Sequence, residues 1–273
     1  MSLDRRRLFA ALAGAATAGA ATPALARDVA ARPATDATTL GLRPNAPDDQ
    51  SKALQRAIDQ AAAAGTVLHL PAGFYRAGAL NLPTHAAIAG IAGLTRIVMA
   101  GGSSMMSATG SDNIALSGLI LDGASIPLPE RRGLIHLAQG RALRIADCEI
   151  VGAGRNGIAL EAMDGEVTGT TISAADNAIF SIDARGLRIA GNTVRSAGNG
   201  GILVWRTTAG DDGTLVVDNR IENVANRSGG SGQYGNGINV FRANNVIVRG
   251  NRISNAAFSA VRGNAASNLQ ILF

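Results

Sequence analysis

Six side chains in the second half of the chain combine aromatic rings with carboxylates and guanidinium groups at recurring positions. If the neighbouring apolar residues point inward, alternation along the strands makes these six side chains point outward in two adjacent columns. One column comprises Glu161, Trp205 and Phe241, and the other comprises Asp183, Arg206 and Arg242. Sugar rings stack on aromatic faces, and acidic sugars pair with guanidinium groups. We therefore predict that these six residues bind substrate and that the partner is a polysaccharide.

A structural alternative fits the same residues. Trp205 and Phe241 can pack beneath an insertion that spans residues 222–234, and Arg206 can pair with Asp183. In that case the aromatic rings stabilise the fold and bind no ligand. The sequence alone leaves both interpretations open.

Two further groups could do acid–base chemistry, but their contexts are less favourable. Asp211 and Asp212 are adjacent carboxylates in a glycine-flanked turn, whereas inverting hydrolysis needs opposed carboxyls about 6.5–9.5 Å apart. We expect this pair to be solvated. His136 alternates with Ile135 and Leu137, so we expect an outward or hydrogen-bonded strand histidine. Catalytic residues therefore remain unassigned.

The elements that position these side chains are repeats. A phrase of two alternating apolar residues, a small residue, a polar residue and an apolar anchor recurs from about residue 112 onward. The anchors stand 29, 22, 22, 27 and 32 residues apart, so the basic unit is about 22 residues with insertions that loop out. These anchors are Leu121, Ile150, Ile172, Val194, Ile221 and Ile253.

A unit of this length is too short for two helices, and it lacks a 3.6-residue apolar stripe. Each unit is therefore one coil of short strands, with a second strand after each anchor, as in residues 156–160 and 236–240. Stacked coils pair like strands in parallel, and such crossovers are nearly always right-handed. The predicted fold class is all-β: a right-handed parallel β-helix, a solenoid with coils of about 22 residues.

Asn192, Asn219 and Asn251 occupy equivalent turn positions in this scheme. Asparagine tolerates the left-handed backbone conformation, and its amide can bond the same residue one coil away. We therefore predict a structural ladder of turns. Cys148 is the only cysteine and is expected to be a buried thiol in a turn, which leaves no intramolecular disulfide.

The first 26 residues carry the features of an export signal. Arg6-Arg7-Leu8-Phe9 matches the core of twin-arginine signals, an apolar Ala/Gly-rich stretch follows, and Ala24-Leu25-Ala26 is a small-x-small cleavage site. An ordinary secretory signal is the alternative. Removing residues 1–26 lowers the formal charge from +5 to +3. No later stretch is apolar enough for a membrane helix, so we expect a periplasmic or secreted protein without an integral membrane segment.

A linker and a capping helix precede the repeats. Residues 27–47 are rich in Ala, Thr and Pro and are predicted to be the linker. Residues 48–64 follow a helical pattern, with an acidic residue or Ser51 available as N-cap and Gly65 at the end. The apolar face comprises Leu54, Ala57, Ile58 and Ala61. This helix should cover the open end of a β-helix domain that spans residues 48–273.

The last residues, Asn268–Phe273, open a further coil, and no polar cap follows them. A solenoid needs a terminal cap to remain soluble. We therefore expect the sequence to be truncated, with the β-helix continuing beyond residue 273.

The order of residues 48–75 carries a family resemblance. Asp48-Asp49, Ala53-Leu54-Gln55 and Leu70-Pro71-Ala-Gly73-Phe-Tyr75, followed by Asn/Gly-rich coils, resemble the start of the pectin-lyase-like superfamily of right-handed β-helices. With its signal, the chain also resembles the uncharacterised twin-arginine-translocated repeat protein family. The superfamily likeness covers nearly all of residues 40–273. It implies the fold, while the superfamily contains polysaccharide lyases, polygalacturonases, sugar epimerases, tailspikes and adhesins.

The catalytic signatures of the better-known branches are missing. The chain lacks the Asn-Thr-Asp and Gly-His-Gly segments of polygalacturonases and the Asp-Pro-His triplet of alginate epimerases. Lyase-type chemistry instead needs carboxylates that hold calcium and an arginine or lysine base. No calcium cluster follows from the spacing. We therefore predict no cofactor, and calcium is the ion to consider for a lyase.

Two function classes remain. The first is an exported protein that binds or cleaves an extracytoplasmic polysaccharide, acidic or neutral, with lyase-like or glycoside-modifying chemistry if it is an enzyme. The second is a non-catalytic structural or adhesive cell-envelope protein. The arginines are dispersed and no nucleic-acid motif is present, so we expect no nucleic-acid partner. We expect a monomer.

The export signal generates the first testable prediction. Replacing Arg6 and Arg7 with lysine should abolish export of the full chain, because the arginine pair defines this class of signal. Cell fractionation followed by immunoblotting measures the exported share. Unimpaired export in a strain that lacks the twin-arginine translocase would contradict the assignment.

Overall fold

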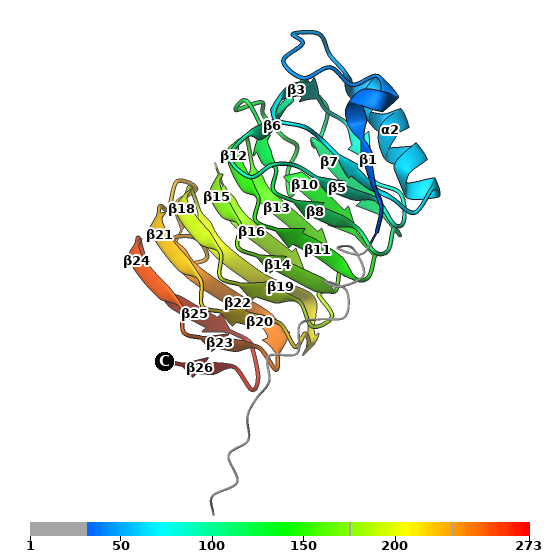
Figure 1. The fold of residues 1–273 in the computed structure, drawn as a ribbon. Coiled ribbons are helices and arrows are strands. Elements are labelled where there is room, and N and C mark those ends of the chain that lie inside the picture. Colours follow the sequence, from blue (N-terminus) through cyan, green and yellow to red (C-terminus); the bar gives the residue numbers. More distant parts are fainter. Residues whose placement is uncertain (1–31, 175, 231) are drawn as a thin grey trace, which may run out of the picture. The chain divides into compact units, whose positions relative to one another are not determined.

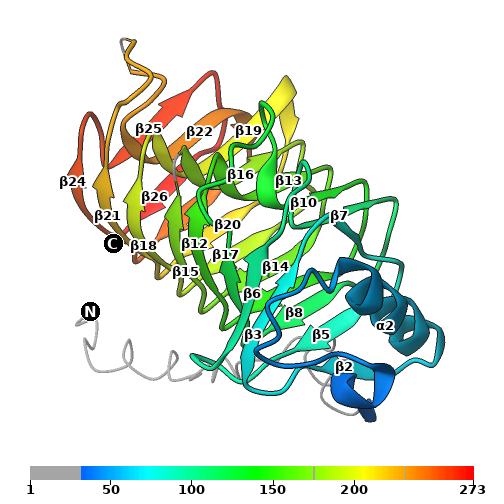
Figure 2. The same cartoon turned by 90° about the horizontal axis from the view of Figure 1, so that it is seen from above.

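Each repeat forms one coil with three short strands, where the sequence pattern indicates at least two. The computed structural model describes residues 32–273 apart from Ala175 and Ser231, within the unit Arg32–Phe273. The predicted signal peptide, residues 1–26, lies outside the described residues. Figures 1 and 2 show like strands of successive coils side by side along this unit. Three parallel sheets, which we call sheets A, B and C, result.

Sheet A is built from the apolar triplets, and its ten strands pair in parallel with the preceding and following coils. Its strands are β1 Ala34–Asp36, β2 Val67–His69, β5 Ala87–Ala89, β8 Ala115–Ser117, β11 Leu143–Ala146, β14 Gly165–Thr168, β17 Arg188–Ala190, β20 Leu215–Val217, β23 Ile247–Arg249 and β26 Gln270–Leu272.

Sheet B contains the apolar anchors, and its eight strands follow sheet A within each coil. They are β3 Gly73–Ala77, β6 Thr95–Met99, β9 Ile120–Asp122, β12 Glu149–Ala153, β15 Thr171–Ala174, β18 Thr193–Ala197, β21 Arg220–Val224 and β24 Arg252–Ala256.

Sheet C completes each coil, and the candidate binding residues lie on its strands or, for Asp183, directly after one of them. Its eight strands are β4 Leu80–Asn81, β7 Met106–Thr109, β10 Gly133–Ala138, β13 Asn156–Glu161, β16 Asn177–Ile182, β19 Gly200–Asp211, β22 Asn236–Asn244 and β25 Val261–Asn264.

The apolar core consists of rows that run from coil to coil. In sheet A, Ile189 pairs with Val216 and Val216 pairs with Val248, and all three side chains are buried. In sheet B, Ile150 pairs with Ile172 in the same way. Parallel strands lie about 4.8 Å apart, so each core side chain packs on the equivalent side chains of the coils before and after it. The predicted inward stack is confirmed.

The predicted asparagine ladder is also confirmed. Asn192 Nδ2 donates to Asn219 Oδ1 at 3.0 Å, and Asn219 Nδ2 donates to Asn251 Oδ1 at 2.9 Å. The expected left-handed conformation instead falls on the residue before each asparagine: Gly191, Asp218 and Gly250. That preceding residue makes the turn, which leaves the asparagine side chain to bond between coils.

Cys148 occupies the same turn position two coils before Asn192. Its backbone N–H donates to Thr170 Oγ1, and the Thr170 N–H donates to Asn192 Oδ1. The thiol is buried, as predicted, and burial raises its pKa to about 11. It is the free cysteine of the described residues.

The predicted capping helix is α2, Ser51–Ala63. Its buried residues are Leu54, Ala57, Ile58 and Ala61, which is the face expected from the sequence. This face packs on the first coils, where α2 contacts β2, β3, β4 and β5 (Figure 1). The N-cap is Gln50 rather than an acidic residue or Ser51, although Asp49 Oδ1 accepts from the Ser51 N–H at 2.8 Å. Among the described residues, no helix has the length and apolar character to cross a membrane.

The β-helix unit begins within the segment predicted as a linker. Strand β1 pairs with β2, and a short 3₁₀ helix, η1 Ala37–Leu40, follows it. The Asp36 carboxylate accepts from the Thr38 N–H at 2.8 Å and caps η1. The first strand of sheet A therefore precedes the capping helix in the chain.

The stacked core generates a stability prediction. Ile189→Asp should lower the free energy of unfolding by several kcal/mol, because it buries an unpaired charge between two coils. Arg188→Asp is the matched control, since Arg188 is the exposed neighbour on β17 and should cost little. Thermal unfolding followed by circular dichroism compares the two variants. Similar melting temperatures would show that the inward register is wrong.

Candidate functional site

The outer face of sheet C presents side chains in rows set by the strand register. Glu161 pairs with Ile182, Ile182 with Trp205, and Trp205 with Phe241, on β13, β16, β19 and β22. Trp205 and Phe241 are therefore direct neighbours. Ile182 separates Glu161 from the two aromatic rings, so the predicted column exists with an apolar residue inside it.

Three adjoining hollows on this face form one groove, which we call the sheet C groove. The first two hollows share Arg131 and Phe180, and the first and third share Trp205. Residues of two loops line it, at 130–131 and 233–234. Side chains from the strands that line the groove include His136, Glu161, Phe180, Trp205, Phe241 and Arg262.

An aromatic row forms the centre of the groove. The Phe180 and Trp205 ring centroids lie 5.4 Å apart, and those of Trp205 and Phe241 lie 5.6 Å apart, both in edge-on arrangements. The guanidinium carbon of Arg242 lies 4.8 Å from the Phe241 centroid. Trp205 and Phe241 remain partly exposed, so loop residues 233–234 flank these rings without covering them.

Several polar atoms in the groove have no partner within the described part of the chain. They are His136 Nδ1, Asn177 Oδ1, Trp205 Nε1 and Asn239 Oδ1, all buried. Such an atom costs about 1–3 kcal/mol when its hydrogen bond is unmade. The described residues therefore leave hydrogen-bonding capacity unfilled at this groove.

His136 and Glu161 line the same hollow at one end of the groove. Burial lowers the pKa of His136 to about 4, and the charge of Arg132 acts in the same direction. The imidazole is therefore neutral at pH 7. Glu161 is exposed beside it on the next strand.

Hydrogen bonds fix the loop of residues 225–230 against the groove. Asn199 Nδ2 donates to Asp176 Oδ1 at 3.0 Å and to Ser228 Oγ at 2.8 Å, and the Ser228 N–H donates back to Asn199 Oδ1. Asp176 also pairs with Arg155 at 2.9 Å. The loop is therefore held in place as one wall of the groove.

Strand β19 bulges out of its pairing with β22 directly after Trp205, and we call residues 206–209 the excursion. Its register to β22 jumps from Trp205–Phe241 to Gly210–Ala243, so residues 206–209 face the single residue Arg242. Asp183 accepts from the Thr207 N–H at 2.9 Å and from Thr207 Oγ1 at 2.8 Å. The carboxylate that the sequence places beside Arg206 therefore holds the excursion instead of pairing with Arg206.

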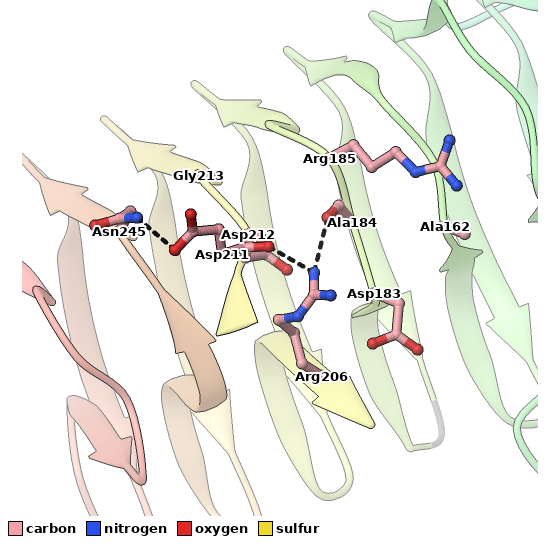
Figure 3. Close-up of a pocket in the computed structure, with 9 residues that line it drawn as sticks. All are labelled: Ala162, Asp183, Ala184, Arg185, Arg206, Asp211, Asp212, Gly213 and Asn245. Atoms are coloured by element: carbon pink, nitrogen blue, oxygen red, sulfur yellow. Dashed lines mark hydrogen bonds between the residues drawn. The ribbon is translucent and has the colours of Figure 1, made fainter. Parts of the chain in front are cut away.

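A hollow of about 480 Å³, separate from the sheet C groove, lies beyond this excursion, at the turns that follow sheet C (Figure 3). We call it the turn cavity. Arg206 Nη1 donates to the carbonyls of Asp211 at 2.7 Å and Ala184 at 3.4 Å, and its Nε donates to Thr208 O. No ion pair of the described residues includes Arg206. Its guanidinium is thus fixed by neutral carbonyls.

The adjacent aspartates behave differently from the solvated pair expected from the sequence. Asp211 is exposed and accepts from Asn245 Nδ2 at 2.8 Å. Asp212 is only 4 % exposed; its Oδ1 accepts from Thr214 Oγ1, while Oδ2 is buried without a partner among the described residues. Burial raises the pKa of Asp212, against the opposing effects of Thr214 and Arg206. The turn is closed over by neighbouring coils, so the expectation is wrong for Asp212.

The structure thus divides the six predicted binding residues between two places. Glu161, Trp205 and Phe241 lie in the sheet C groove, and Arg242 covers the Phe241 ring and donates to Thr207 O at 2.8 Å. Asp183 and Arg206 line the turn cavity. Sequence reasoning omitted several lining residues, of which Phe180 could have been found by continuing the alternation from Ile179. The residues omitted from the predicted set include Arg131, His136, Phe180, Asn239 and Asp212.

Within residues 32–273, apart from the two undescribed positions, no cluster of three or more His, Cys, Asp or Glu is arranged to hold a metal ion. The carboxylates of the turn cavity are instead engaged by Thr207, Thr214 and Asn245. The side chains that line the sheet C groove and the turn cavity offer hydrogen bonding, ion pairing and aromatic stacking.

Comparisons with known proteins agree with this architecture. Residues 98–221 match the family described as the right handed beta helix region. No curated protein matches the chain by sequence. The A-module of the mannuronan C-5 epimerase AlgE6 of Azotobacter vinelandii is similar in structure, with a TM-score of 0.59 and 19% identity, over 87% of this chain and 74% of that one.

Two further solved structures are similar. The exopolygalacturonase of Thermotoga maritima has a TM-score of 0.55 and 12% identity, over 91% of this chain and 79% of that one. Gene product 12 of bacteriophage phi29 has a TM-score of 0.60 and 16% identity, over 87% of this chain and 34% of that one. At these identities the likeness shows the fold alone. The chain folds as a right-handed parallel β-helix, as the sequence predicted.

The raised pKa of Asp212 generates a pH prediction. In the unfolded chain this carboxyl ionises at an ordinary pKa near 4, but in the folded chain ionisation is penalised by burial. The wild type therefore loses stability as the pH rises through the raised pKa. Asp212→Asn should melt at a higher temperature than wild type at pH 7, with the difference vanishing at low pH.

Thermal unfolding at a series of pH values measures this difference. Asp211→Asn is the matched control, because Asp211 is exposed and should show no such pH-dependent gain. A melting temperature of Asp212→Asn that stays below that of wild type at every pH would contradict the account of the buried carboxylate.

Proposed function

We propose that this chain is an exported protein that binds an extracytoplasmic polysaccharide along the sheet C groove. The observation that carries the proposal is the partly exposed aromatic row, in which the Trp205 indole N–H lacks a partner among the described residues. A sugar complements both features, because its C–H face stacks on an aromatic ring and its hydroxyl groups accept from an N–H.

The other polar atoms of the groove support the same class of ligand. Trp205 Nε1 is a donor and Asn239 Oδ1 is an acceptor, and both are unpaired near the same aromatic ring. A hydroxyl group donates and accepts, so a chain of sugars pairs with both. An apolar ligand would leave them unpaired at a cost comparable to a lost hydrogen bond.

The comparisons and the leader sequence support the biological setting. Two of the similar structures are a mannuronan C-5 epimerase and an exopolygalacturonase. The Arg6-Arg7-Leu8-Phe9 segment supports twin-arginine export to the periplasm or the exterior. A polysaccharide outside the cytoplasm is the partner that suits both the groove and this route.

Cleavage is a separate step of the proposal. His136 is neutral at pH 7 and lines one hollow with Glu161, so these are two groups of the groove that could move a proton. If the protein is an enzyme, a lyase-type elimination is the reaction class we propose. Incubation with oligouronates and detection of unsaturated products by ultraviolet absorbance distinguishes this from non-catalytic attachment by a structural or adhesive envelope protein.

The groove generates a binding prediction. Trp205→Ala should weaken oligosaccharide binding by about 1–2 kcal/mol through lost stacking, with little loss of stability because the ring is partly exposed. Isothermal titration of the full chain with oligogalacturonates, oligomannuronates and cello-oligosaccharides measures the effect. Phe74→Ala is the control, since Phe74 is 39% exposed on β3 of sheet B.

Binding of at least one of these probes by wild type and by Phe74→Ala, with weaker binding by Trp205→Ala, would support the proposal. Equal affinities for wild type and Trp205→Ala would leave the aromatic row with a packing role only. Failure of wild type to bind any of the three probe classes would count against the proposed function for those polymers.

A further inference from the structure

The turn cavity contains a buried carboxylate oxygen for which the fold supplies no partner. Asp212 is 96% buried, and its Oδ1 is occupied by Thr214, whereas Oδ2 has no hydrogen bond within the described residues. The hydrogen bond from Thr214 to Oδ1 would hold the turn without any contribution from Oδ2. Oδ2 is therefore a carboxyl oxygen at the edge of a hollow that is available to bind a ligand. The hollow measures about 480 Å³, within the roughly 300–1,000 Å³ of small-molecule sites.

A guanidinium group lies at the same cavity with one edge open. Arg206 is held through Nη1 and Nε by three backbone carbonyls, and Nη2 makes no hydrogen bond to the described residues. These carbonyls orient the group but do not neutralise its charge. Figure 3 shows the Arg206 guanidinium between Asp212 and Asp183. A fixed arginine with a free N–H edge is suited to a carboxylate.

The remaining walls of the cavity narrow the class of ligand. The Asp183 and Asp211 carboxylates are engaged by Thr207 and Asn245. Arg185 adds a second positive group, and its side chain extends over Ala162 in Figure 3. Asp211 Oδ2 is exposed and also lacks a partner among the described residues, so the unengaged groups are two carboxyl oxygens, of which only Asp212 Oδ2 is buried, and two guanidinium groups. The guanidinium groups suit an anionic group, and Asp212 Oδ2 suits a hydroxyl group, of one small ligand.

We propose that the turn cavity is a second binding site, separate from the sheet C groove, for a small hydroxycarboxylate of the sugar-acid type. The ligand carboxylate pairs with the open edge of Arg206, and Arg185 adds positive charge beside it. A ligand hydroxyl group hydrogen-bonds to Asp212 Oδ2. The excursion of residues 206–209 lies between this cavity and the groove, so the site does not rest on binding at Trp205.

The test uses D-galacturonate as the probe and D-galactose as its neutral counterpart. Amide chemical shifts of the isotope-labelled full chain, followed during titration, give both the affinity and the location of binding. Arg206→Gln removes the charge, and Asp212→Asn replaces the carboxyl with an amide of the same shape that still accepts from Thr214. Arg249→Gln, an exposed arginine on sheet A, is the matched control.

We expect D-galacturonate to shift the amides of residues 211–213 and to bind at least about tenfold more tightly than D-galactose, because an ion pair is made only with the acid. Arg206→Gln and Asp212→Asn should each weaken binding by a similar factor. Arg249→Gln should bind as wild type does, and Trp205→Ala should keep the shifts at residues 211–213. Circular dichroism confirms that each variant is folded, and Arg185→Gln provides a third variant that disturbs no backbone contact.

Several results would overturn the second site. These are no binding of D-galacturonate to wild type, equal affinity for D-galactose, or unchanged affinity in both Asp212→Asn and Arg206→Gln. Binding that is lost in Trp205→Ala but kept in Arg206→Gln would place the sugar acid in the groove. That outcome would support the proposed function and reject the turn cavity as a site.

Discussion

The structure depends on one interaction, the in-register pairing of each strand with the equivalent strand of the next coil. Every coil satisfies its backbone hydrogen bonds through its neighbours, because a strand of three or four residues cannot do so alone. The same register places like side chains on top of one another. It therefore creates the buried rows of Ile189, Val216 and Val248, and it brings the asparagine amides of successive turns within hydrogen-bond distance.

This register also determines what the outer faces can do. On sheet C it brings Trp205 and Phe241 together although they are 36 residues apart in the sequence. Strand register alone makes them neighbours. Two insertions lie outside the paired rows, so they change the walls of the groove while the rows stay in place. They are the loop between β21 and β22 and the excursion within β19. One flanks the groove, and the other separates it from the turn cavity.

Much of this could be predicted from the sequence, because the relevant patterns are periodic. The anchor spacing identified the coils, and alternation correctly put Ile189 inward and Trp205 outward. Features that depend on non-periodic contacts between coils could not be predicted. Asp212 looks like a solvated turn residue beside Gly213, yet the turns of the adjacent coils bury it. Asp183 and Arg206 are adjacent by register, but Thr207 takes the Asp183 carboxylate because β19 leaves the sheet there.

The lone thiol at the ladder position gives the molecule an internal reporter. A solenoid opens locally, since each coil contacts only its neighbours, and local opening has its own free energy. Cys148 lies in the middle of the stack, where it is buried and its pKa is raised to about 11. A thiol reagent therefore reaches the sulfur, in its reactive thiolate form, only when this coil opens. The rate at which this single sulfur is modified therefore measures the opening of one defined coil, and it distinguishes fraying at the ends of the stack from cooperative unfolding of the whole.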